Sequence, residues 1–95
     1  MRLDVRGEMC PYPAMRTRAA LEKLPEGEVL EVLTDHPPAL STVPFEGARK
    51  GFEAEIASVG RGEWRIVLHR TGAAYDAEAV VQRVAARVAE LKGET

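Results

Sequence analysis

Charged side chains at alternate positions of the strand-like segments restrict the fold of this chain more than any other feature. Four segments alternate apolar with polar residues, which is typical of half-buried β-strands: residues 2–5, 29–34, 52–59 and 63–69. One set of alternate positions is mostly charged: Arg2, Asp4, Glu31, Glu53, Glu55, Arg65 and His69. Because such a face prefers water, we expect the connecting helices on the opposite face, in a two-layer sandwich.

Two segments between these strands have helical periodicity. In residues 11–24 the apolar and small side chains fall on one stripe, with the charged residues largely outside it. Residues 39–50 follow a break at which Asp35 can act as a cap or turn acceptor. Pro44 and Gly47 interrupt this second segment, so a single helix and two short turns joined by a bend both fit the sequence.

The order of the segments is strand, helix, strand, helix, strand, strand. Helical crossovers make the first three strands parallel. Gly60 and Gly62 flank Arg61 in a tight hairpin signal, so the last strand is expected to run antiparallel to the third. These features predict an α/β (α+β) two-layer sandwich of β-α-β-α-β-β order with a mixed sheet.

A further helix is expected near the C-terminus. Asp76 suits the N-cap position. An apolar stripe follows at alternating steps of four and three residues: Ala77, Val81, Val84, Val88 and Leu91, with Val80 and Ala85 alongside. We interpret residues 71–95 as a helical extension of the domain formed by residues 1–70. The stripe needs an apolar partner, either the helical layer or edge of its own domain, or a second chain in a homodimer.

Composition argues against several classes of function. The 95 residues fit one small domain. One cysteine cannot form an intramolecular disulfide, and with two distant histidines it cannot build a zinc cluster, so neither metal nor cofactor is expected. The single thiol favours a reducing, cytoplasmic location. The net charge of −2 argues against nucleic-acid binding, and neither a membrane span nor a signal peptide is apparent.

The only cysteine, Cys10, lies in the stretch GEMCPYP, directly before the predicted first helix. Free backbone N–H groups and the aligned peptide dipoles favour an anion at a helix N-terminus. A thiol at such a position ionises more readily, and the thiolate is its reactive form. Pro11 and Pro13 fit the first helical turn, where a missing N–H group breaks no helical hydrogen bond. We therefore interpret Cys10 as a reactive thiol held at the N-terminus of the helix.

Less specific interpretations of these residues stay open. A lone cysteine is most often a small buried apolar residue. Arg6, Arg16 and Arg18 are near enough in sequence to add positive potential around the sulfur or to contact a partner. For Arg16 and Arg18, ordinary solvated helix charges are the alternative. Tyr12, between the prolines, has no assigned role.

The residues around Cys10 resemble the signature of a known family. The spacing Asp4-x-x-Gly7-x-x-Cys10-Pro11-x-Pro13 is similar to that of the TusA/SirA-like sulfur-carrier proteins. In that family a strand and a glycine loop lead to Cys-Pro-x-Pro at the start of the first helix. The similarity continues through the stretch PEGEVLEVLTDHPPAL. Cys10 is thereby implied as the catalytic residue, and the other four residues as its supporting motif.

This resemblance covers about residues 3–70 and implies a sheet order of 1-2-4-3 and a role in sulfur relay. A family member accepts a sulfane sulfur from a cysteine desulfurase or rhodanese-like donor, carries it as a persulfide and passes it to an acceptor protein. The implied pathways are tRNA thiolation, cofactor synthesis and sulfur oxidation. The family usually ends soon after the last strand, so the helix at 76–92 indicates a different partner, a dimer or a stabilising addition.

Other functions compete with a sulfurtransferase-type carrier. A non-catalytic regulatory or interaction module would use the C-terminal helix to dimerise or dock. A thiol redox protein would form mixed disulfides, although the lack of a second cysteine rules out an intramolecular cycle. A direct nucleic-acid binder fits least, because the chain is acidic and poor in aromatic residues.

Overall fold

The computed structural model describes residues 1–71 and 76–94 of the chain, without the side chains of residues 92–94. Its elements follow the predicted order: β1 (Arg2–Asp4), α1 (Tyr12–Lys23), β2 (Leu30–Thr34), α2 (Ala39–Arg49), β3 (Phe52–Gly60), β4 (Glu63–Arg70) and α3 (Ala77–Glu94). Residues 72–75 and 95, which the predicted C-terminal extension includes, lie outside the described residues.

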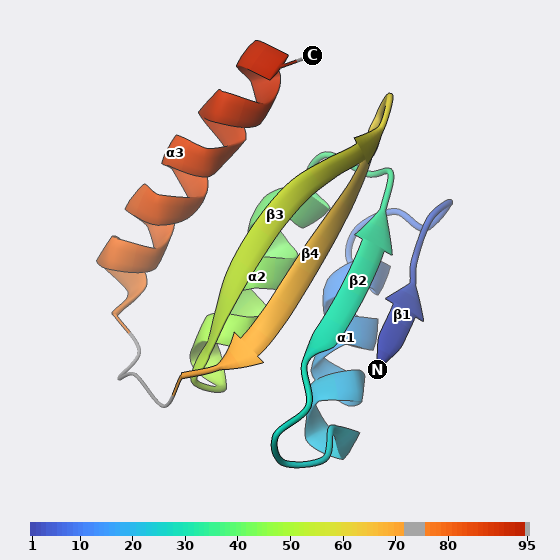
Figure 1. Ribbon diagram of the computed structural model, residues 1–95, viewed down its shortest axis with the longest axis vertical. Coiled ribbons are helices and arrows are strands. Elements are labelled where there is room, and N and C mark those ends of the chain that lie inside the picture. The colour runs from blue at the N-terminus through green and yellow to red at the C-terminus, as the bar shows by residue number, and fades with distance from the viewer. Residues whose placement is uncertain (72–75, 95) are drawn as a thin grey trace.

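The four strands form one mixed sheet in the order β1-β2-β4-β3. β1 pairs with β2 in parallel, and β4 runs antiparallel to both of its neighbours. The first three strands therefore share one direction, as predicted. Helices α1 and α2 lie together on one face of the sheet, whereas the opposite face carries no helix among the described residues (Figure 1). The predicted two-layer sandwich, its sheet order and its additional C-terminal helix are confirmed.

The core lies between the sheet and this helical layer. The alternate strand positions that are apolar in sequence point into it, and the helices contribute the apolar residues of their inner stripes. The side chains with no exposed surface are mainly branched and aliphatic: Val5, Leu30, Val32, Val43, Ile66 and Leu68. The charged alternate positions face away from the helices, as expected for a sheet with one wet face.

The segment 39–50 forms one helix, α2, and not two short turns. Pro44 lies inside this helix and is buried. Gly47 is needed for packing, because a Cβ atom there would lie 2.8 Å from Leu68 Cδ2 of the sheet. Asp35 does not cap α2, which has no side-chain cap. Its Oδ1 instead accepts the backbone N–H of Gly7, which lies in the connection between β1 and α1, at 2.9 Å.

Helix α3 packs on α2 and on the edge strand β3 within the same chain (Figure 1). Asp76 caps it as predicted, since its Oδ1 accepts the Ala79 N–H at 3.2 Å. The predicted apolar stripe is partly wrong. Val80, Val84 and Leu91 are buried, whereas Val81 and Ala77 are exposed. The buried residues Val80 and Leu91 are eleven positions apart, which corresponds to three helical turns. A stripe that repeats strictly every seven residues therefore leaves this buried face toward the N-terminal end of the helix.

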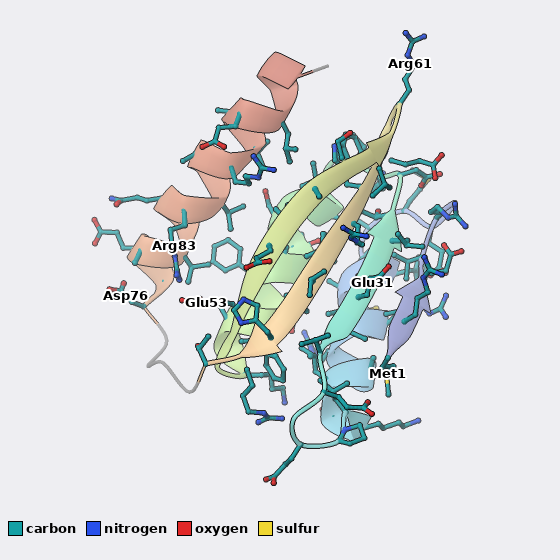
Figure 2. The ribbon with its side chains drawn as sticks, viewed as in Figure 1. Met1, Glu31, Glu53, Arg61, Asp76 and Arg83 are labelled. Carbon is teal, nitrogen blue, oxygen red and sulfur yellow. The ribbon has the colours of Figure 1, made fainter. Side chains whose placement is uncertain are left out.

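Two arginines of α3 bind β3 directly. Arg83 Nη1 lies 3.1 Å from Glu53 Oε1, and Figure 2 shows these two side chains facing each other across the gap between helix and strand. Arg87 donates from Nη2 and Nε to the carbonyl oxygen of Ile56, at 2.7 and 3.0 Å. The Arg87 hydrogen bonds occupy the carbonyl oxygen of Ile56 on the edge strand β3, which another strand could otherwise pair with.

Candidate functional site

Cys10 lies in the connection between β1 and α1, at one edge of the sheet, and its side chain is exposed. We call residues 5–11 the Cys10 loop. The exposure argues against the interpretation of this cysteine as a small buried apolar residue. Because α3 contacts β3, at the opposite edge of the sheet, it leaves this side of the molecule open (Figure 1).

Two tight turns shape the Cys10 loop. The first closes through a hydrogen bond from the Glu8 N–H to the Val5 carbonyl oxygen at 3.1 Å, and it requires Gly7, whose φ is +85°. The second closes from the Tyr12 N–H to the Met9 carbonyl oxygen at 3.0 Å and contains a cis peptide bond before Pro11. Cys10 therefore occupies a central position of the second turn, directly ahead of α1.

The first turn of α1 offers an anion fewer free N–H groups than expected for a helix N-terminus. Pro11 is the N-cap residue, and neither it nor Pro13 has an N–H. The Tyr12 N–H is already donated to Met9. Ala14 supplies the remaining N–H of this turn. The aligned peptide dipoles of the helix, more than direct hydrogen bonds, favour negative charge ahead of it.

The three arginines proposed near the sulfur all have carboxylate partners. Arg6 binds Asp4 at 2.8 Å and Glu63 at 3.0 Å. Arg16 pairs with Glu8 of the Cys10 loop, and Arg18 forms two hydrogen bonds with Glu46 of α2, at 3.0 and 3.1 Å. These pairs link the loop and α1 to carboxylates, of which Glu8, Glu46 and Glu63 were not predicted from the sequence.

Three large apolar side chains close to Cys10 in the sequence are exposed, which was not predicted from the sequence. Met9, Tyr12 and Met15 are 67, 58 and 54% exposed. They are spaced three residues apart, from the second turn onto α1, and this spacing is the sequence signal that could have identified them. We call them the apolar collar. Exposed methionine and tyrosine are residue types that protein partners commonly contact.

Hydrogen bonds from Arg6 lower the pKa of the Asp4 carboxyl from 3.8 to about 2. A carboxyl whose folded-state pKa is lowered adds stability that is complete above its unfolded pKa and is lost as the pH falls through the folded value. We therefore expect the Asp4–Arg6 pair to hold at pH 3 and to be lost as the pH approaches 2. Carboxyl ¹³C shifts of Asp4, followed by NMR between pH 6 and 1.5, measure this directly.

In the variant Arg6→Gln the charged donor is gone but the backbone N–H of residue 6 still bonds Asp4, so the pKa of Asp4 should rise toward 3.8 without reaching it. Glu46, whose pKa is lowered by its hydrogen bonds with Arg18, is the matched control and should be unchanged in that variant. A wild-type Asp4 that titrates at its ordinary value would contradict the observed pairing.

The described residues contain no group of three or more histidine, cysteine, aspartate or glutamate side chains placed to hold a metal ion. Within the same part of the chain, no helix is both long enough and apolar enough to span a membrane.

Comparisons with known proteins point to one family. The sequence profile described as "Sulfurtransferase TusA" matches residues 1–70. A "putative sulfur carrier protein" of Thermotoga maritima is 43% identical over 67 residues, covering 70% of this chain and 85% of the relative. A protein of the same name from Archaeoglobus fulgidus is 39% identical over 69 residues, covering 72 and 78%.

A solved structure agrees with these sequence matches. The crystal structure of a SirA-like protein from Desulfitobacterium hafniense superposes with a TM-score of 0.65 at 25% identity, covering 70% of this chain and 92% of that chain. The profile match ends at residue 70, so α3 lies outside it.

Proposed function

The chain belongs to the TusA family of sulfurtransferases, and on that premise we propose that it is a sulfur carrier that accepts a sulfane sulfur on Cys10 and relays it to an acceptor protein. The observation that carries this proposal is the exposure of Cys10. A carrier must offer the same sulfur atom to two different proteins in turn, and a buried thiol could reach neither. As the only cysteine of the chain, Cys10 is also the only thiol available.

The proposed step is a thiol exchange that needs no external oxidant or reductant. The Cys10 thiolate attacks the outer sulfur of the donor persulfide, a new S–S bond forms, and the donor thiolate leaves as the old S–S bond breaks. Cys10 then holds a persulfide, whose outer sulfur is attacked in the same way by the acceptor thiolate. The dipole of α1 favours both the attacking thiolate and the persulfide anion that replaces it.

The motif residues support this role by shaping the site. Gly7 permits the first turn of the Cys10 loop, while Asp4 holds Arg6 at the end of β1. Pro11 and Pro13 start α1 directly behind the thiol without adding N–H donors. Arg6, Arg16 and Arg18 each form ion pairs with carboxylates. In this proposal a partner protein recognises the pattern of positive and negative charge that these ion pairs form on the surface.

The partners follow from the family. We propose a cysteine desulfurase or a rhodanese-like protein as the donor and a downstream sulfur-acceptor protein as the recipient, in the cytoplasm. The acceptor pathway is tRNA thiolation, cofactor synthesis or sulfur oxidation. The apolar collar, close to Cys10 in the sequence, is a suitable contact surface for such partners, because burying exposed apolar area stabilises a transient complex.

The proposal is tested by loading the wild-type protein. Incubation with a cysteine desulfurase and cysteine, and separately with a rhodanese and thiosulfate or with polysulfide, is expected to add one sulfur atom to the intact mass. A reductant should remove this mass again, and peptide mapping should place it on Cys10. If none of these donors adds sulfur to the protein, the proposed carrier function is wrong.

A further inference from the structure

A hydrogen bond through a side chain joins the Cys10 loop to the residue that follows the neighbouring strand, β2. The backbone N–H of Gly7, in the first turn of the loop, donates to Oδ1 of Asp35 at 2.9 Å. Asp35 directly follows β2, and the two residues are 28 positions apart in the chain. This contact therefore fixes the turn that precedes Cys10 against the end of a central strand.

Asp35 is exposed, but the backbone that leads into it is buried and paired. Thr34, the last residue of β2, is fully buried and pairs with Trp64 of β4. Its hydroxyl also accepts the N–H of His36 at 3.1 Å, which shapes the backbone on the other side of Asp35. A short aspartate side chain on such a backbone has few rotamers to lose, so it can hold Gly7 with little conformational freedom.

Asp4 Oδ1 also accepts a backbone N–H of the loop, that of Arg6 at 3.0 Å, but it does so locally, from two residues earlier in the chain. The remaining side-chain contacts of the loop are ion pairs. Arg6 reaches Asp4 and Glu63, and Arg16 reaches Glu8, through long and exposed guanidinium side chains. Exposed pairs of this type restrict the backbone weakly, because both partners can move together in solvent. The Asp35 contact, although exposed too, joins a backbone N–H three residues before the cysteine to a side chain 28 positions away in the chain.

We propose that Asp35 is a positioning residue for the sulfur-transfer reaction: its hydrogen bond to the Gly7 N–H holds the Cys10 loop at the orientation from which the sulfur meets the donor. This inference rests on the proposed carrier function. Thiol exchange requires the attacking sulfur to lie nearly in line with the S–S bond that breaks, so a small displacement of the loop lowers the rate. A small reagent in solution can approach an exposed thiol from many directions and does not need this placement.

The variants Asp35→Ala and Asp35→Asn separate the hydrogen bond from the charge. Asparagine keeps a side-chain oxygen that can accept the Gly7 N–H, and alanine does not. In single-turnover transfer from a persulfidated cysteine desulfurase, Asp35→Ala is expected to be about 10-fold slower than wild type and Asp35→Asn within about 3-fold, a range that small misplacements of reacting groups commonly produce. Alkylation of Cys10 by iodoacetamide is expected to stay within about 2-fold in all three proteins, because the thiol is exposed.

A backbone measurement reports the contact itself. Amide hydrogen exchange of Gly7 should be slowed in wild type and in Asp35→Asn, and fast in Asp35→Ala. Asp76→Ala is the matched control, because Asp76 also accepts one backbone N–H through Oδ1, from Ala79 at 3.2 Å, but at α3 on the opposite edge of the sheet. It should leave both the transfer rate and the Gly7 exchange unchanged.

The outcomes distinguish this inference from the proposed function. If wild type accepts no sulfur from any donor, the carrier function is wrong and the positioning role falls with it. If wild type loads normally but Asp35→Ala transfers at the wild-type rate, the carrier function stands and the positioning role is overturned. The role is also overturned if Asp35→Asn is as slow as Asp35→Ala while its Gly7 amide stays protected, because the charge and not the hydrogen bond would then matter.

Discussion

The variant Cys10→Ser is expected to lose sulfur acceptance down to the uncatalysed background while keeping the fold. A serine hydroxyl is not ionised near neutral pH and cannot take the place of the thiolate in thiol exchange. Because Cys10 is exposed, replacing its sulfur removes no core packing. Exposed substitutions usually change the free energy of unfolding by less than about 0.5 kcal/mol. Intact mass after incubation with a persulfide donor and urea unfolding measure the two effects.

A relocated thiol provides the control for position. Ser41 is exposed in the first turn of α2, so Ser41→Cys in the Cys10→Ser protein restores one exposed thiol outside the Cys10 loop. We expect this double variant to react with iodoacetamide but not to accept sulfur from a donor protein at the wild-type rate. Equal sulfur loading of the double variant and the wild type would show that any exposed thiol suffices and that the loop has no role.

The second large effect is expected in α3, where Val84→Asp should lower the free energy of unfolding by about 2–4 kcal/mol. Val84 is 9% exposed and packs with Val80 and Ala48 of α2. An aspartate there would bring a charge into this apolar contact, beside Arg83 and Arg87, which already bind Glu53 and the Ile56 carbonyl. A cavity of about 220 Å³ beside Val84 lets water approach the carboxylate, which keeps the cost toward the lower end of that range.

Val81→Asp is the matched control for this substitution. It places the same side chain in the same helix, at a residue that is 49% exposed, so its effect should stay within about 0.5 kcal/mol. Urea unfolding of both variants gives the comparison. Equal destabilisation by the two variants would contradict the observed face of α3 and would favour a helix that pairs through the predicted heptad stripe.

The same variants separate the carrier from an interaction module. In a carrier, Val84→Asp should still accept sulfur on Cys10 wherever it remains folded, because α3 contacts β3 and Cys10 follows β1 at the other edge. In cells, Cys10→Ser should then match a deletion. A module that works through α3 predicts the reverse pattern, with a silent Cys10→Ser and a deleterious Val84→Asp.

The fold class could be predicted because its signals are local. The alternation of charged and apolar residues depends only on the two-residue period of a strand, and it places water on one face of the sheet. Gly60 and Gly62 mark the β3–β4 hairpin within a few residues. The sheet order was available only through the family resemblance, because strand alternation alone does not say which strand lies beside which.

For the site, the sequence by itself determined that one thiol stands ahead of a helix, between a glycine turn and two prolines. Only the tertiary structure decided that this thiol is exposed and which groups surround it. Arg18 meets Glu46 and Gly7 meets Asp35 across 28 residues, and Arg6 meets Glu63 across 57. It also decided that Val80, and not Val81, faces the domain. Such contacts depend on how strands and helices are placed relative to one another, and that placement follows from packing the whole core and not from any local period.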